Sequence, residues 1–291
     1  MSKIGMIGLG VMGHGIAQNL MDKGFELVLY DLRPEALEDL AAQGAQTVPS
    51  PEELGKATGT VLMIVIAYPH CQSALEGLLE TMRSGTVINM STISMEEAQK
   101  LEAYAAERGV SMLDCPVSGG SAGAKAGTLT LMAAGTDELL QAHLPILEAF
   151  SSNIVHVGTK VGQGQAMKAI NQLLVGVHMC ATAEAFTLAR QCGLDLQQVY
   201  DTIRTSAGTS RIFENRGQFL IDRNFSTRST LQIQLKDTGI VCDTAAAVGA
   251  PSFLANTARE LFKLAVRKDP PTDDSIAVAR LYEELCGLEI K

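Results

Sequence analysis

Three glycine-containing stretches of this chain carry residue types that could bind an anion or move a proton. The first reads GLGVMG over residues 8–13, directly after a predicted strand and at the start of a predicted helix. In that setting Gly8 allows a tight turn, Gly10 lets the backbone approach a pyrophosphate, and Gly13 permits close helix-to-strand packing. The free amides of the helix N-terminus would bind the phosphates. The stretch predicts a dinucleotide site, with a glycine-rich turn that binds nothing as the alternative.

A carboxylate at a suitable distance strengthens this interpretation. Asp31 follows the second predicted strand, 21 residues after Gly10, where it can accept hydrogen bonds from the adenosine ribose. A carboxylate opposes a 2′-phosphate, so Asp31 favours NAD over NADP. Arg33 could pair with that phosphate or lie in solvent, which leaves NADP open. The predicted cofactor-binding residues are Gly8, Leu9, Gly10, Val11, Met12, Gly13 and Asp31.

The second stretch, DCPVSGG over residues 114–120, also follows a predicted strand. Its small residues leave backbone amides and the Ser118 hydroxyl open to an anion such as a substrate carboxylate, although a flexible turn has the same composition. The third stretch, GQGQAMKAINQ over residues 162–172, begins a long predicted helix.

Lys168, Asn171 and Gln172 stand at i, i+3 and i+4 in that helix and therefore share one face. Their neighbours are apolar. A lysine in such a place must extend to solvent, pair with an acid or act chemically, and desolvation favours the neutral form that a general base needs.

Composition excludes several classes of protein. The 291 residues suggest about two domains. With 46% apolar and 19% charged residues the chain is a folded protein, and its net charge of −9 disfavours nucleic acid and membrane surfaces as partners. The apolar run over residues 61–67 is far shorter than the roughly 20 residues of a membrane span. Six scattered cysteines and five isolated histidines predict a cytoplasmic protein without a metal site.

The pattern of elements changes near residue 162. Before it, short β-branched or apolar runs alternate with helical stretches, as in a parallel α/β sheet. After it, every segment reads as a helix. We therefore expect a doubly wound Rossmann-type domain over residues 1–162, and a long connecting helix with an all-α domain over residues 163–291. The expected strands are residues 3–7, 26–30, 61–66, 86–89, 111–113, 129–133 and 154–157.

Taken together, these motifs resemble the β-hydroxyacid dehydrogenase family. That family includes 3-hydroxyisobutyrate dehydrogenase and tartronate semialdehyde reductase, and is related to 6-phosphogluconate dehydrogenase. Four motifs match in order: GLGxMG at 8–13, DxPVSGG at 114–120, GxGxxxKxxN at 162–171, and Lys236-Asp237. The resemblance covers essentially the whole chain and implies a small hydroxy acid as substrate, NAD as cofactor, and a homodimer or homotetramer.

The resemblance also implies roles for individual residues. Lys168 would be the general acid/base that takes the hydroxyl proton as hydride leaves for the nicotinamide. Thr92 would lie between nicotinamide and substrate, and Asn171 would orient the substrate hydroxyl. Lys236 would contact cofactor or substrate, or close the cleft. The residues implied to hold the substrate carboxylate are Ser118, Gly119 and Gly120.

Two departures from the family pattern are Gln172, where many members have a second Asn, and residues 66–69. With residues 206–208, 213–216 and 273–275, they most resemble the L-threonate dehydrogenase branch, which oxidises a four-carbon sugar acid. Ser229 adds a hydroxyl where several relatives with small substrates have Phe, and an unpaired buried hydroxyl costs roughly 1 to 3 kcal/mol. Arg211 would add a charge near the substrate or face solvent. The alternatives are 3-hydroxyisobutyrate or tartronate semialdehyde chemistry, or a dinucleotide sensor without activity.

Overall fold

The chain forms two compact units, Met1–Lys168 and Ala169–Lys291. The computed structural model describes residues 3–226 and 229–290. The first unit extends past residue 162 into helix α8 (Gln163–Gln191), whose first turn is bonded to Asp114 of the sheet through the Gln165 backbone N–H at 3.1 Å. Each unit has its own hydrophobic core.

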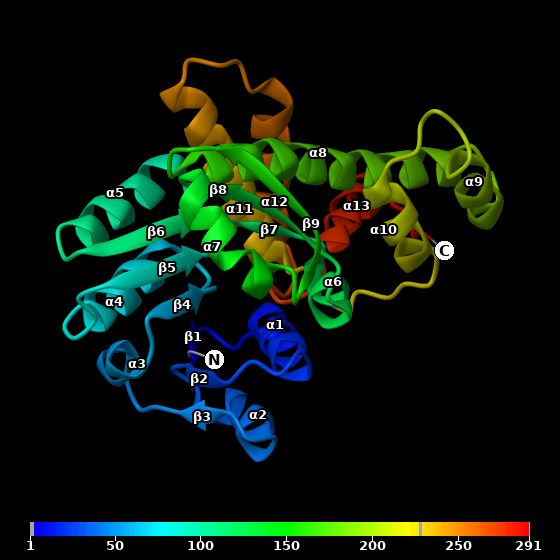
Figure 1. Ribbon diagram of the computed structural model, residues 1–291. Helices are drawn as coiled ribbons and strands as arrows, with labels where there is room; N and C mark the ends of the chain where they lie inside the picture. The colour runs from blue at the N-terminus through cyan, green and yellow to red at the C-terminus, as the bar shows by residue number, and fades with distance from the viewer. Residues whose placement is uncertain (1–2, 227–228, 291) are drawn as a thin grey trace. The chain divides into compact units, whose positions relative to one another are not determined.

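Within the described residues, nine strands form one sheet in the first unit (Figure 1). Their order is β3-β2-β1-β4-β5-β6-β8-β7, with β9 paired to β8. The six strands from β3 to β6 are parallel and follow the doubly wound order, which reverses at β1. The strands are β1 (Ile4–Ile7), β2 (Leu27–Tyr30), β3 (Gln46–Thr47), β4 (Thr60–Met63), β5 (Gly85–Asn89), β6 (Val110–Asp114), β7 (Val117–Ser118), β8 (Leu129–Ala134) and β9 (Ser151–Gly158).

The predicted Rossmann-type α/β class is therefore confirmed, with two differences in detail. Strands β3 and β7 were not predicted, because each has two residues and shows no periodic pattern. The sheet is also not wholly parallel, since β8 runs antiparallel to β6 and β7.

Helices cover both faces of the parallel strands, because consecutive strand residues are buried on opposite sides. Met6 and Leu62 belong to one core and their neighbours Ile7 and Val61 to the other. The Ser94 hydroxyl and the Glu97 carboxylate form a reciprocal capping box that begins α5. The helices on the first face are α1 (Val11–Asp22), α2 (Glu38–Ala42), α6 (Gly120–Ala126) and α7 (Asp137–Leu147). Those on the second face are α3 (Pro51–Ala57), α4 (Tyr68–Leu78) and α5 (Met95–Ala106).

In the described part of the second unit all the regular elements are helices, as predicted, apart from an isolated bridge between Thr230 and Asp274. Phe186, Phe213 and Phe262 are at its centre, and the rings of Phe186 and Phe213 stack at 5.5 Å. The last helical segment begins with a short 3-10 turn, η2 (Ser275–Val278). Its α-helices besides α8 are α9 (Leu196–Ile203), α10 (Arg211–Ile221), α11 (Leu231–Ala247), α12 (Phe253–Lys268) and α13 (Ala279–Cys286).

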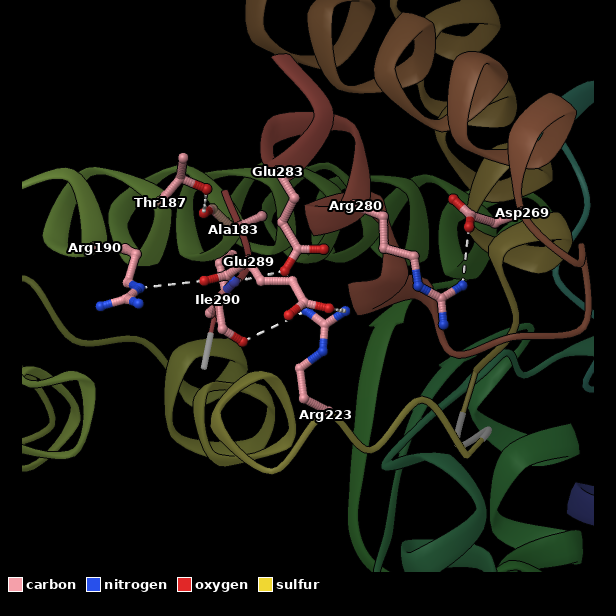
Figure 2. Close-up of polar contacts among 9 residues, drawn as sticks. All are labelled: Ala183, Thr187, Arg190, Arg223, Asp269, Arg280, Glu283, Glu289 and Ile290. Atoms are coloured by element: carbon pink, nitrogen blue, oxygen red, sulfur yellow. Dashed lines mark hydrogen bonds and ion pairs between the residues drawn. The ribbon is translucent and has the colours of Figure 1, made fainter. Parts of the chain in front are cut away.

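Hydrogen bonds and an ion pair hold the end of the described chain against this helical core (Figure 2). Ile290 is completely buried, and its N–H donates to the Glu283 carboxylate at 2.7 Å. Arg223 pairs with the same carboxylate and donates to the Ile290 carbonyl. Arg190 donates to the Glu289 carbonyl at 3.3 Å. A buried carboxylate with two donors therefore anchors the last described turn of the chain.

Within the described residues, α8 alone is long and apolar enough to cross a membrane by length and composition, and 50% of its most apolar window is buried. This helix is the long one predicted to begin in the third glycine-containing stretch. Core helices of globular proteins have the same composition.

Candidate active site

The glycine loop after β1 has the geometry that a dinucleotide requires. Gly8 has φ +94°, and a Cβ on it would lie 2.2 Å from the Ile64 carbonyl oxygen. A Cβ on Gly13 would lie 1.9 Å from the Gly8 carbonyl oxygen. Gly10, in contrast, has no atom within 4 Å of such a Cβ. The first and third glycines are thus required by the protein's own packing, and the second leaves open space for a ligand.

Helix α1 begins directly at this open space. Gly10 is its N-cap and cannot cap through a side chain, and its first turn contains no acidic residue. The positive end of the helix therefore suits an anionic group such as a pyrophosphate. Val11 is exposed there, Met12 is partly buried, and Leu9 is buried in the core.

Asp31 lies at the end of β2 beside this loop. One oxygen accepts the Leu9 N–H at 2.6 Å, and the other accepts the backbone N–H of Arg33 at 2.9 Å and its Nε at 3.2 Å. Burial alone would raise the pKa of Asp31, but the bonds from Arg33 and Leu9 outweigh it and hold the pKa below its ordinary value. Asp31 is therefore a carboxylate at neutral pH, and the open glycine loop together with this anion fits an NAD adenosine.

A second buried carboxylate, Asp114, joins the end of β6 to the start of α8. Its Oδ2 accepts the N–H groups of Gly162 at 2.9 Å and Gln165 at 3.1 Å. A Cβ on Gly164 would lie 2.9 Å from the same oxygen, so the second glycine of this motif permits the approach. Burial raises the pKa of Asp114 to about 6, against the lowering effect of these bonds. The sequence predicted no such role for Asp114, because its partners lie 48 and 51 residues away.

Lys168 lies at the end of the first unit, on α8, with only 7% of its surface exposed. It follows Gln165 by three residues, so the two lie on one side of the helix. Gln165 is 1% exposed and bonds to the segment that contains Thr92, which is half-buried. Gln165 therefore shares α8 with the predicted proton-transfer lysine and bonds to the backbone on both sides of the predicted nicotinamide neighbour, a role that no local sequence signal indicated.

The loop predicted to hold a carboxylate follows the short strand β7. Ser118 is half-buried and pairs with Thr130 of β8. Gly119 and Gly120 have φ +137° and +64°, and a Cβ on Gly120 would meet no atom within 4 Å. A backbone of this kind favours glycine, and both residues are exposed.

In the helical unit, Asn171 and Lys236 are joined through two buried side chains. Asn171 Nδ2 donates to Gln172 Oε1 at 2.8 Å, and Gln172 Nε2 donates to Asp237 Oδ2 at 2.6 Å. The other oxygen of Asp237 pairs with Lys236 Nζ at 2.9 Å. Gln172, one of the departures from the family pattern, thus links Asn171 to Asp237 in this series of hydrogen bonds.

Two segments that resemble the L-threonate dehydrogenase branch also meet in the helical unit. Asp274 is completely buried and pairs with Arg216 Nε at 3.0 Å. The Ser229 N–H donates to Asp274 Oδ2 at 3.3 Å, and the Ser275 N–H donates to the Ser229 carbonyl at 2.8 Å. Arg211, by contrast, is exposed at the start of α10.

The described residues contain no group of three His, Cys, Asp or Glu that could hold a metal ion. All six cysteines carry free thiols, and four of them are buried. Burial raises the pKa of the Cys180 thiol to about 12, which keeps it protonated.

Comparison with known proteins shows the family to which the chain belongs. The family model for the NAD binding domain of 6-phosphogluconate dehydrogenase matches residues 3–158, and the model for NAD-binding of NADP-dependent 3-hydroxyisobutyrate dehydrogenase matches residues 162–282. L-threonate dehydrogenase of Cupriavidus necator is 38% identical over 291 residues, which cover 99% of this chain and 97% of the relative. That of Pectobacterium atrosepticum is 35% identical over 284 residues, with 96% and 93% covered.

A solved structure supports the same family. The crystal structure of 3-hydroxyisobutyrate dehydrogenase from Salmonella typhimurium matches with a TM-score of 0.90 and 35% identity, covering 97% of this chain and 100% of that one. The fold, the glycine loop and Asp31 define an NAD-binding dehydrogenase. This chain belongs to the NAD-dependent β-hydroxyacid dehydrogenase family.

Proposed function

We propose that this enzyme oxidises a four-carbon sugar acid such as L-threonate with NAD. The observation that carries the chemistry is the buried Lys168, which belongs to the same compact unit as the glycine loop. The substrate class is supported by L-threonate dehydrogenases that are 35–38% identical over nearly the whole chain.

In this proposal the chain's own residues bind the acid and move one proton. Neutral Lys168 accepts the proton of the substrate hydroxyl at Nζ, as the alcohol becomes a carbonyl. NAD held by the glycine loop and Asp31 would supply the acceptor for the hydride of the carbinol carbon. The Ser118 hydroxyl and the amides of Gly119 and Gly120 hold the substrate carboxylate, while Thr92 orients the reacting groups. In the reverse direction the Lys168 ammonium returns the proton.

A second candidate substrate is 3-hydroxyisobutyrate, favoured by the structure from Salmonella typhimurium that bears that name. The side chain at position 229, a serine here, distinguishes the two candidate substrates. A polyhydroxylated acid needs polar partners, whereas an aromatic side chain at this position would suit a smaller, more apolar acid. Asp274 and Ser275 hold the Ser229 backbone from both sides, which favours a defined role for this position.

The test is a screen of three-carbon and four-carbon hydroxy acids for NADH formation by the purified full-length chain. We expect L-threonate to give the highest kcat/KM, and Ser229→Phe to shift that preference toward 3-hydroxyisobutyrate by about tenfold. Ser226→Phe, at an exposed position three residues earlier, is the matched control. A wild-type preference for 3-hydroxyisobutyrate would replace the first candidate with the second.

We also propose that the chain acts in the cytoplasm as a homodimer or homotetramer. Large apolar side chains are exposed on two helices of the helical unit: Ile170 and Leu174 on α8, and Phe253 and Leu254 on α12. Apolar surface of this kind is typical of subunit interfaces. Light scattering would show the mass of a multimer, and Phe253→Glu with Leu254→Glu would reduce it; a monomeric wild type would contradict the proposal.

A further inference from the structure

The side chain of Gln165 bonds to the backbone on both sides of Thr92. Its Oε1 accepts the Ile93 N–H at 3.1 Å, and its Nε2 donates to the Ser91 carbonyl at 3.0 Å. Thr92 lies between these two residues, so one side-chain amide fixes the peptide groups before and after it. Gln165, Ser91 and Ile93 are each 1% exposed, so water does not compete for these bonds.

Asp114 holds Gln165 from another direction. Gln165 Nε2 donates its other hydrogen to Asp114 Oδ1 at 2.7 Å, and the Gln165 backbone N–H donates to Oδ2. The orientation of the amide is settled by its backbone partners, because the Ile93 N–H can only donate and the Ser91 carbonyl can only accept. Both hydrogens of Nε2 and the oxygen of the amide are therefore used.

Only glutamine has this combination of groups and length. Glutamate would offer no donor and would place a second carboxyl beside buried Asp114, whereas asparagine is one methylene shorter and could not reach both sides of Thr92. Gly162, with φ +95°, and Gly164 bring this turn of α8 close enough for the contact. Lys168 follows three residues later on the same rigid helix, a rise of about 4.5 Å.

We propose that Gln165 is a positioning residue, which fixes Thr92 relative to Lys168 so that both meet the reacting carbon in one arrangement. The inference rests on the proposed function, in which Lys168 moves the proton. Gln165 touches neither substrate nor cofactor in this scheme and acts through the Ser91–Ile93 backbone. Misplacement of a reacting group by about 1 Å lowers turnover by as much as about a hundredfold.

Gln165→Met tests this directly, since it keeps the length and volume of the side chain and removes all three bonds. We expect kcat to fall between about tenfold and a hundredfold, with KM and the Kd for NADH changed by less than about threefold. Gln99→Met is the matched control, because Gln99 Nε2 also donates to a backbone carbonyl of the first unit, that of Val161 at 3.4 Å. It should leave kcat within about twofold of the wild type.

A double-mutant cycle separates positioning from a general loss of stability. Thr92→Ala should lower kcat in the wild type and have a much smaller further effect in Gln165→Met, because Gln165 acts through Thr92. Losses that multiply in the double variant would overturn the inference. If Gln165→Met does not fold, Gln165→Asn takes its place with the same expected results.

Hydrogen exchange gives a readout that does not depend on the substrate. The Ile93 amide should exchange at least about tenfold faster in Gln165→Met than in the wild type, and at the wild-type rate in Gln99→Met. An unchanged Ile93 rate would overturn the inference even in an active enzyme. Absence of turnover with every hydroxy acid would instead contradict the proposed function, while faster Ile93 exchange would still support the role of Gln165.

Discussion

The carboxylate of Asp31 accepts the backbone N–H of Leu9 at 2.6 Å, so the group expected at the cofactor ribose also holds the glycine loop. The two residues are 22 positions apart and lie at the ends of neighbouring parallel strands. One side chain therefore has two separable effects on cofactor binding: its charge and its hydrogen bond to the loop.

Two substitutions at Asp31 should divide these effects. Asp31→Asn removes the charge and keeps an acceptor for Leu9, so kcat/KM with NADP should rise by about tenfold relative to NAD while binding of NAD falls only a few-fold. Asp31→Ala also removes the hydrogen bond to the Leu9 N–H of the glycine loop, and should weaken NAD binding by about tenfold or more. Steady-state kinetics with both cofactors measure the ratio.

Arg33→Ala removes a side chain that pairs with Asp31 and leaves the Leu9 bond in place. It is the control for NAD binding alone, since Arg33 could itself pair with the 2′-phosphate of NADP. A wild-type enzyme with higher kcat/KM for NADP than for NAD would contradict the interpretation of Asp31.

Replacement of Lys168 should remove proton transfer and leave cofactor binding. We expect Lys168→Ala to lower kcat by about a hundredfold to ten-thousandfold, with an NADH Kd close to the wild-type value. Lys160→Ala, at an exposed lysine before α8, is the matched control and should keep full turnover. Full turnover in Lys168→Ala with the true substrate would show that another group moves the proton.

The unfolding free energy should depend on pH through Asp114. Its folded pKa of about 6 is above the ordinary value of 3.8, so the folded protein binds this proton more tightly than the unfolded chain. Stability from this group is complete below about pH 4 and is lost as the pH rises through about 6. The wild type should therefore lose about 3 kcal/mol relative to Asp114→Asn over that range.

Urea denaturation of both proteins between about pH 4 and pH 7 measures this difference. A wild type that gains stability relative to Asp114→Asn as the pH rises would mean that the hydrogen bonds to the carboxylate outweigh the cost of its burial.

Glu283 should be important for the stability of the helical unit. Glu283→Ala leaves the buried Ile290 N–H without an acceptor and removes the buried carboxylate that pairs with Arg223, so we expect a loss of about 2 kcal/mol. Glu289→Ala removes an exposed carboxylate 3.8 Å from the same arginine and should cost less than about 1 kcal/mol. Equal losses in the two variants would show that the anchor at Ile290 contributes little.

Much of the fold could be predicted because its signals are local. The strands of the parallel sheet are apolar runs between turns, and α8 follows a glycine-rich stretch with helical periodicity, so both can be found by inspection. The two-residue strand β7 could not, because a segment of that length has no period and forms only where β8 offers a partner. The residues of the glycine loop and Asp31 were likewise visible, since their spacing alone carries the signal.

The sequence by itself determined the alternation of the longer strands and helices and the position of the dinucleotide loop, and it led to the prediction that Lys168 moves the proton. Only the tertiary structure decided what holds them. Gln165 reaches Ser91 across 74 residues and Asp114 across 51, and no periodicity links such positions. Burial supplies the physical reason: away from water each polar group must find a partner, and that partner is whichever group the fold brings within hydrogen-bond distance.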